Sequence, residues 1–278
     1  MPLPVWQESV VDPPSINVIP PQAPFFYAKK FFAVDSSGST VGAIMRAQAK
    51  SVAAFHGNRS DTVTKWDHKC EMPQILENVP VNYFAGSGGT SPDTILRQPA
   101  AIERIRESDL WVLTTDGEIA ERSVSELTRL ADVVEVIHVP IVLLIVGGRY
   151  SSPSNTNISI GITFFAAARE ALILFKDYST GHLYLIGAKG GFAPLKNEGS
   201  LGSIDLSSWE SLPEYTNEAA FVKHCEELAI NLTQSQGRRS PTRATSLGPE
   251  WDNALVDICS SRYSYIAHPA KGNASGPA

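Results

Sequence analysis

Three oxygen-bearing side chains, each two residues from the next, follow an apolar segment near the start of the chain. The segment covers residues 31–34 (FFAV), and the three residues are Asp35, Ser37 and Ser39. Alternate side chains of a short loop can converge on one point, and these side chains offer only oxygen atoms. Oxygen ligands suit hard cations such as Mg²⁺ or Mn²⁺ better than zinc or copper. The loop is therefore a candidate metal site.

The positions of these side chains depend on the elements around them. Residues 30–35 have strand character, and apolar residues between 41 and 56 then recur at helical spacing. Open α/β sheets bind ligands at the carboxyl ends of their strands. Two later segments carry further oxygen ligands: Thr90 follows a glycine-rich loop, and Asp116 ends the apolar stretch that begins at Leu110. We expect Asp116 to lie at the same edge of the sheet as Asp35.

Strand and helix patterns alternate along most of the chain, which favours an α/β fold. Besides the strand and the helix that flank the first loop, helix patterns cover 95–105, 123–132 and 217–232. Strand patterns cover 62–66, 81–84, 110–115, 139–146, 171–175 and 183–186. Residues 158–168 are apolar and have no clear period. Residues 66–70 include one His and one Cys, which is half of a zinc site, and a turn is the better interpretation.

The order Asp35-x-Ser37-x-Ser39, then Thr90, then Asp116 resembles the von Willebrand factor A (vWA) family and its metal-ion-dependent adhesion site (MIDAS). The resemblance covers about residues 28–232. It implies a doubly wound, mostly parallel central sheet with helices on both faces. It does not extend to the loop 149–157, to residues 158–168 or to either end of the chain.

The resemblance also implies a ligand set and a partner. Ser37, Ser39 and Thr90 would hold Mg²⁺ or Mn²⁺ directly, while Asp35 and Asp116 would bind it through hydroxyl contacts or water. These groups leave an octahedral cation short of ligands, so an outside oxygen must complete its shell. We expect a metal-dependent protein interaction module that binds an Asp or Glu side chain of a protein partner.

Other interpretations of the same residues remain open. Asp35, Ser37 and Ser39 can act as helix caps. Residues 35–40 also resemble the first phosphate loop of the actin and sugar-kinase ATPases, with Asp116 and Gly117 in the second. In those enzymes a β-hairpin turn forms the first loop, whereas a helix pattern follows it here. No catalytic constellation such as G-x-S-x-G occurs, so we do not predict an enzyme. A scaffold with an empty site is a further alternative.

Composition limits the partners and the compartment. The chain has 278 residues and a formal net charge of −6, which argues against binding nucleic acid through its phosphates. Its three cysteines form no C-x-x-C pair, and it has no signal-peptide pattern and no apolar run that could span a membrane. We therefore expect a cytoplasmic protein. The predicted parts are a Pro-rich extended arm (1–26), a vWA-like domain (27–232) and a disordered tail (233–278) in which residues 251–258 can form a short helix.

Overall fold

The computed structural model describes residues 22–148, 150–196, 206 and 209–233. Eight strands form one sheet in the order β4-β3-β2-β5-β6-β7-β8-β9, and two short strands, β1 and β10, pair separately. The strands are β1 (Gln22–Pro24), β2 (Lys30–Asp35), β3 (Thr62–Trp66), β4 (Gln74–Ile75), β5 (Leu110–Thr115), β6 (Ile141–Gly147), β7 (Ala171–Asp177), β8 (Leu183–Lys189), β9 (Glu214–Tyr215) and β10 (Asn231–Thr233). The helices are α1 (Ala43–Phe55), α2 (Pro99–Arg106), α3 (Glu121–Val133), α4 (Ser159–Ala167) and α5 (Glu218–Glu227). The described chain is thus a mixed α/β structure.

The five central strands, β3, β2, β5, β6 and β7, run parallel, and β4, β8 and β9 pair antiparallel at the two sides. Every residue of β2, β5 and β6 is buried. Continuous burial explains why these strands are apolar on both faces, as expected where helices cover a parallel sheet.

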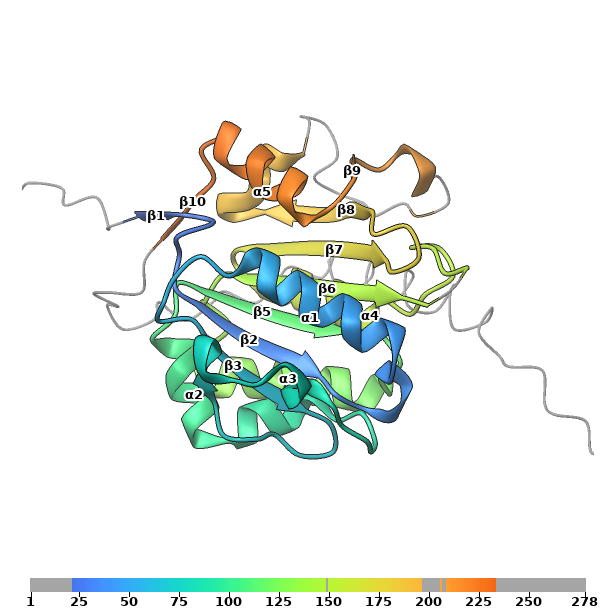
Figure 1. Cartoon of the computed structure of the whole chain (residues 1–278). Helices are drawn as coiled ribbons and strands as arrows, with labels where there is room; N and C mark the ends of the chain where they lie inside the picture. Colours follow the sequence, from blue (N-terminus) through green and yellow to red (C-terminus); the bar gives the residue numbers. More distant parts are fainter. Residues whose placement is uncertain (1–21, 149, 197–205, 207–208, 234–278) are drawn as a thin grey trace, which may run out of the picture.

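Two hydrophobic clusters lie on the two faces of this sheet. One contains Phe32, Val112 and Leu144 together with residues of α1 and α5, and the other contains Phe31, Leu113 and Ile145 together with residues of α2, α3 and α4. Figure 1 shows α1 in front of the sheet and α2, α3 and α4 behind it. Successive residues of one strand therefore contribute to opposite clusters, as the alternation of side chains in a strand requires.

A buried polar group anchors α5 to the front face. Lys176 of β7 forms an ion pair with Glu218 at the first turn of α5, and its Nζ lies 3.1 Å from the hydroxyl of Ser51 on α1. All three residues are buried. Asn217 caps α5 by accepting a hydrogen bond from the backbone N–H of Ala220 at 2.9 Å. These contacts bind α5 to the sheet and to α1.

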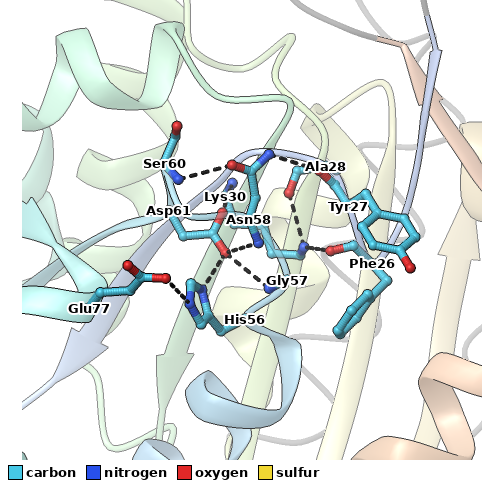
Figure 2. Close-up of polar contacts among 10 residues, drawn as sticks. All are labelled: Phe26, Tyr27, Ala28, Lys30, His56, Gly57, Asn58, Ser60, Asp61 and Glu77. Atoms are coloured by element: carbon cyan, nitrogen blue, oxygen red, sulfur yellow. Dashed lines mark hydrogen bonds and ion pairs between the residues drawn. The ribbon is translucent and has the colours of Figure 1, made fainter.

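Another polar group closes the amino ends of β2 and β3 (Figure 2). Asp61 is fully buried and accepts hydrogen bonds from the backbone N–H groups of Lys30 (2.7 Å), Gly57 (3.3 Å) and Asn58 (3.2 Å). Its other neighbour is His56, whose Nδ1 lies 2.8 Å from Oδ2 of Asp61. The Asp61 carboxylate therefore fixes the turn that enters β3.

Lys30 is buried at this same edge. Its Nζ donates to the carbonyl groups of Phe26 (2.7 Å) and Ala28 (3.0 Å), and burial lowers the pKa of Lys30 to about 8, against the opposing charges of Asp61 and Asp109. The cation also lies over the rings of Phe25 and Phe26. The segment that precedes β2 is thus packed onto the sheet.

The packed structure begins earlier than the predicted domain start at residue 27. Strand β1 pairs with β10, and Phe25 is buried in edge-to-face contact with Phe55, Phe192 and Phe221. Residues 22–26 therefore belong to the packed part, because pairing and aromatic burial outweigh the local effect of Pro24. Residues 1–21 and 234–278, with most of the predicted arm and tail, lie outside the described residues.

In three places the structure differs from the sequence predictions or adds to them. Residues 81–84 form a 3-10 turn instead of a strand, since the outer side of β3 is already paired with β4. The helix predicted over 217–232 ends at Glu227, where Ala229 takes a positive φ of 50° and the chain turns into β10. The unassigned segment 158–168 contains α4, whose nearly uniform apolar character leaves no polar face to mark its period.

Candidate metal centre

The loop after β2, which carries Ser37 and Ser39, lies where the strand order of the sheet reverses. The chain passes from β2 through α1 to β3 on one side, and β5 lies on the other side of β2. Such a point at the carboxyl ends of parallel strands is where open α/β sheets bind ligands. Val34 of β2 is aligned with Thr114 of β5, so Asp35 and Asp116 end neighbouring strands at one edge. This confirms the predicted relation between these two residues.

The loop after β2 holds its oxygen atoms close together. Oδ1 of Asp35 accepts a hydrogen bond from the backbone N–H of Ser37 at 2.9 Å, and the hydroxyl oxygens of Ser37 and Ser39 lie 3.2 Å apart. Thr40 closes the turn by donating to the carbonyl oxygen of Ser37 at 2.9 Å. Asp35 and Ser37 are fully buried, whereas Ser39 is exposed. The loop therefore extends from the interior to the surface.

Helix capping does not account for these side chains. Helix α1 begins at Ala43, two residues after the start of the helical pattern at residue 41, and its N-cap is Gly42 with φ +90°. The caps of α1 and of the 3-10 turn at Gly38–Thr40 have no side-chain hydrogen bond. The serine hydroxyls are therefore not used to satisfy N–H groups at a helix start.

The loop 85–91 is joined to this one through its backbone. Gly38 donates its N–H to the carbonyl oxygen of Gly88 at 3.0 Å, two residues before Thr90. A Cβ atom on Gly86 would lie 2.4 Å from the backbone oxygen of Ser36, so only glycine permits this close approach. Thr90 is half-buried, and among the described residues its side chain forms no hydrogen bond with the other four residues. The loop that carries Thr90 thus lies against the loop after β2, and the role of Thr90 as a metal ligand stays a prediction.

Asp116 is 6% exposed, and its Oδ1 accepts a hydrogen bond from the N–H of Glu118 at 3.0 Å. Between them, Gly117 has φ +85°, and a Cβ atom there would lie 2.1 Å from the carbonyl oxygen of Asn157. A glycine is therefore required for the turn that follows Asp116 and for the contact with the loop after β6.

The charge state of Asp35 reflects this environment. Burial, together with a smaller effect of the neighbouring charge of Asp116, raises the pKa of Asp35 to about 7. Hydrogen bonds from Ser37 and Thr115 act in the opposite direction. A carboxylate that loses hydration without gaining a positive partner is a group that a cation would stabilise.

Two residues that support Asp35 were not predicted from the sequence. Thr115 donates its hydroxyl to Oδ2 of Asp35 at 2.8 Å and accepts the N–H of Gly117 at 3.1 Å. Gln48 of α1 donates Nε2 to the carbonyl oxygen of Asp35 at 3.2 Å and accepts a hydrogen bond from Thr114. The available signals were a second hydroxyl before Asp116 and a single amide within the alanine-rich sequence of α1.

The residues fit a hard divalent cation in one geometric respect. Adjacent ligands of octahedral Mg²⁺, each about 2.1 Å from the ion, lie about 3 Å from each other. The Ser37 and Ser39 oxygens, 3.2 Å apart, have this separation. Within the described ranges, no group of three or more His, Cys, Asp or Glu side chains is arranged to hold a metal. Hydroxyl groups must therefore supply part of any site here.

Comparisons with known proteins give no family. No protein-family model matches the chain, and no curated protein matches it. Among solved structures the chain is similar to the PilB minor pilin from Streptococcus sanguinis, with a TM-score of 0.39 and 10% sequence identity over 73% of this chain. The matched region spans 61% of that pilin's chain. This likeness is too distant to support an argument about function.

None of the helices among the described residues has the length and apolar character needed to cross a membrane.

Proposed function

We propose that the protein is a divalent-metal-dependent protein interaction module of the vWA type. In this proposal Asp35, Ser37, Ser39, Thr90 and Asp116 form the candidate metal site and hold Mg²⁺ or Mn²⁺. The observation that carries the proposal is the convergence of two buried carboxylates and paired serine hydroxyls at the reversal of strand order. A doubly wound arrangement, with helices on both faces of the sheet, is the fold that would place them so.

The donor set determines the kind of ligand. Ser37, Ser39 and Thr90 would contact the cation directly, and Asp35 and Asp116 would act through the hydroxyls or through water. A bound cation supplies Lewis acidity and an open coordination position for an anionic oxygen. The exposed Ser39 marks the side from which an Asp or Glu carboxylate of a partner protein would enter.

The alternative of an ATPase of the actin and sugar-kinase type receives less support. That fold needs a hairpin turn at the first phosphate loop. Here β2 leads through α1 into β3, and the two strands are parallel. The same loop thus enters a helical crossover, which suits the interaction module better.

Calorimetric titration of the full chain with Mg²⁺ and Mn²⁺ tests the metal site. We expect binding by the wild type, and loss of binding in Asp35→Ala and in the double variant Ser37→Ala/Ser39→Ala. Ser60→Ala is the matched control, because Ser60 is exposed at the amino end of β3, at the opposite edge of the sheet. Equal titrations for all four proteins would contradict the proposal.

A pull-down from cell extract with and without EDTA tests the interaction. Partners captured by the wild type should be lost in EDTA and in Asp35→Ala, and should return when Mg²⁺ is restored. Capture that is unchanged in EDTA would exclude a metal-dependent mechanism.

A further inference from the structure

The turn after β3 lies at the same edge of the sheet as the candidate metal site. Trp66, the last residue of β3, is aligned with Asp35 of β2, so Asp67 begins its turn beside the loop after β2. The neighbouring parallel strands β3, β2 and β5 thus each carry an aspartate at this end: Asp67, Asp35 and Asp116. The turn that contains Asp67 supplies none of the proposed ligands, but it adjoins the loop that carries one of them.

That loop, residues 85–91, is rich in glycine around Thr90. Residues 86, 88 and 89 are glycines, which lose more conformational freedom on folding than other residues do. Gly88 takes a positive φ of 138°. A hydroxyl group on such a loop can serve as a metal ligand only where contacts with neighbouring segments hold it in place, as the partners of metal ligands do in known sites.

Two backbone hydrogen bonds hold this loop, one on each side of Thr90. Before Thr90, the carbonyl oxygen of Gly88 accepts the N–H of Gly38, in the loop after β2, at 3.0 Å. After Thr90, the N–H of Ser91 donates to the carbonyl oxygen of Asp67, in the turn after β3, at 3.0 Å. The backbone of Thr90 is therefore held between the loop after β2 and the turn after β3.

The carboxylate of Asp67 shapes this turn. Asp67 is 7% exposed, and its Oδ1 accepts the N–H of Lys69 at 2.9 Å and lies 3.0 Å from Nδ1 of His68. Its Oδ2 faces the glycine-rich loop: a Cβ atom on Gly88 would lie 3.2 Å from Oδ2 of Asp67 and 2.5 Å from Nδ1 of His68. The Asp67 side chain thus fixes the turn and forms part of the surface against which Gly88 packs.

We propose that Asp67 is a positioning residue for the candidate metal site and holds the hydroxyl group of Thr90 within reach of the cation. This inference rests on the proposed function and adds the turn after β3 to the segments that build the site. Asp67 acts on Thr90 through the backbone of the loop, whereas Thr115 acts on Asp35 through a direct hydrogen bond. Loss of the Asp67 carboxylate releases the turn, and with it the Ser91 end of the loop.

A double-mutant cycle in the full chain tests this inference. The affinities for Mg²⁺ and Mn²⁺ are measured by calorimetry, and by the electron paramagnetic resonance signal of free Mn²⁺ where binding is weak. Asp67→Ala should weaken binding by roughly tenfold or more, as is typical for groups that orient metal ligands. In Thr90→Ala, which already lacks the ligand, adding Asp67→Ala should change the affinity by less than about twofold, because the two residues act as one unit.

Asp109→Ala is the matched control. Asp109 is also buried, and its Oδ2 accepts the N–H of Lys29 at 2.9 Å at the amino end of β5, on the opposite edge of the sheet. Urea denaturation without metal should show a loss of stability in both Asp67→Ala and Asp109→Ala. Only Asp67→Ala should lose metal affinity, so the effect on the site is separated from a general effect on the fold.

Two further variants test the same contact by other means. Asp67→Asn keeps a side-chain oxygen for the N–H of Lys69 and should retain most of the metal affinity. Gly88→Ala places a Cβ atom against His68 and should displace the loop, so it should weaken metal binding when Thr90 is present and have little effect in Thr90→Ala. If Asp67→Ala does not fold, Gly88→Ala takes its place in the cycle.

The outcomes separate this inference from the proposed function. If the loss of affinity in Asp67→Ala is the same with and without Thr90, or if either single variant binds metal as tightly as the wild type, the inference is wrong while the metal site stands. If the wild type binds neither Mg²⁺ nor Mn²⁺, the proposed function fails, and the inference fails with it.

Discussion

The hydroxyl group of Thr115 donates a hydrogen bond to Oδ2 of Asp35 at 2.8 Å, and so joins the ends of β5 and β2. The same hydroxyl accepts the N–H of Gly117 and holds the turn that contains Asp116. One buried side chain thus positions both carboxylates of the candidate metal site.

Replacing Thr115 should weaken metal binding without removing a ligand. Thr115→Val keeps the shape of the side chain but leaves Asp35 without this donor, so we expect a loss of Mg²⁺ affinity of roughly 10–100-fold, typical for groups that orient metal ligands. Thr115→Ser should retain most of the affinity. Calorimetric titration measures both effects.

Thr128→Val, on the distant helix α3, serves as the control for Thr115→Val because it also removes a hydrogen bond donated by a threonine hydroxyl, here to the carbonyl oxygen of Val124. An unchanged Mg²⁺ affinity in Thr115→Val would show that the contact with Asp35 has no part in metal binding.

Metal binding should depend on pH through Asp35. Its pKa in the folded protein is raised from 3.8 to about 7, so protons compete with the cation below pH 7. We expect the Mg²⁺ association constant to fall by up to about tenfold for each pH unit below 7. Calorimetric titrations at several pH values between about 5.5 and 8, a range that brackets the shifted pKa, measure this change in affinity. A flat profile would argue against Asp35 as a participant.

The same shift affects stability in the presence of chelator. Between about pH 4 and pH 7 the folded state binds the Asp35 proton and the unfolded state does not, so the Asp35 contribution to stability falls as pH rises. Asp35→Asn should remove this slope and stabilise the metal-free protein at pH 8 by at most about 4 kcal/mol. Urea denaturation at several pH values measures the difference. If the unfolding free energy of the wild type changed with pH as that of Asp35→Asn does, the raised pKa of Asp35 would be contradicted.

Lys30 should make the stability of the protein rise with pH in the alkaline range, which is opposite to the effect of Asp35. Its pKa is lowered from 10.5 to about 8 in the folded protein, so between these values the unfolded state binds more protons and the Lys30 contribution to stability rises with pH. The rise is at most about 3 kcal/mol. Lys30→Met should lack it, whereas the exposed control Lys50→Met should keep it. Identical slopes in urea denaturation for Lys30→Met and the wild type would refute the prediction.

Removing only one member of the buried ion pair between Lys176 and Glu218 should lower the unfolding free energy of the protein. Lys176→Met leaves the Glu218 carboxylate buried without its partner, and we expect a loss of about 3–5 kcal/mol of unfolding free energy. Lys176→Met/Glu218→Leu should recover most of this loss. Chemical denaturation of the two single variants and the double variant measures the coupling. Additive losses would show that the two groups do not act as a pair.

The central strands could be predicted because their signal is local. The bounds of β2 and β3 follow from short apolar or β-branched runs that end in polar residues, and such runs are decided by burial on both faces. The two aspartates at the ends of β2 and β5 could be aligned for the same reason. The sequence therefore predicted the edge at which the candidate site lies.

The missed features depend on tertiary contacts. The pairing of β1 with β10 joins segments about 200 residues apart, and nothing in the local sequence of either indicates it. The roles of Thr115 and Gln48 likewise arise only when α1, β2 and β5 pack together.

The pairing of β1 with β10 also has a mechanical consequence. Gln22 is aligned with Thr233, so the described chain begins and ends at one point, at the amino edge of β2 and away from the candidate metal site (Figure 1). A force applied through these two ends would open the β1–β10 ladder one hydrogen bond at a time, like a zipper, while the parallel strands that carry Asp35 and Asp116 stayed outside the line of pull. The edge of the sheet that holds Asp35 and Asp116 would therefore stay folded while the β1–β10 ladder opens.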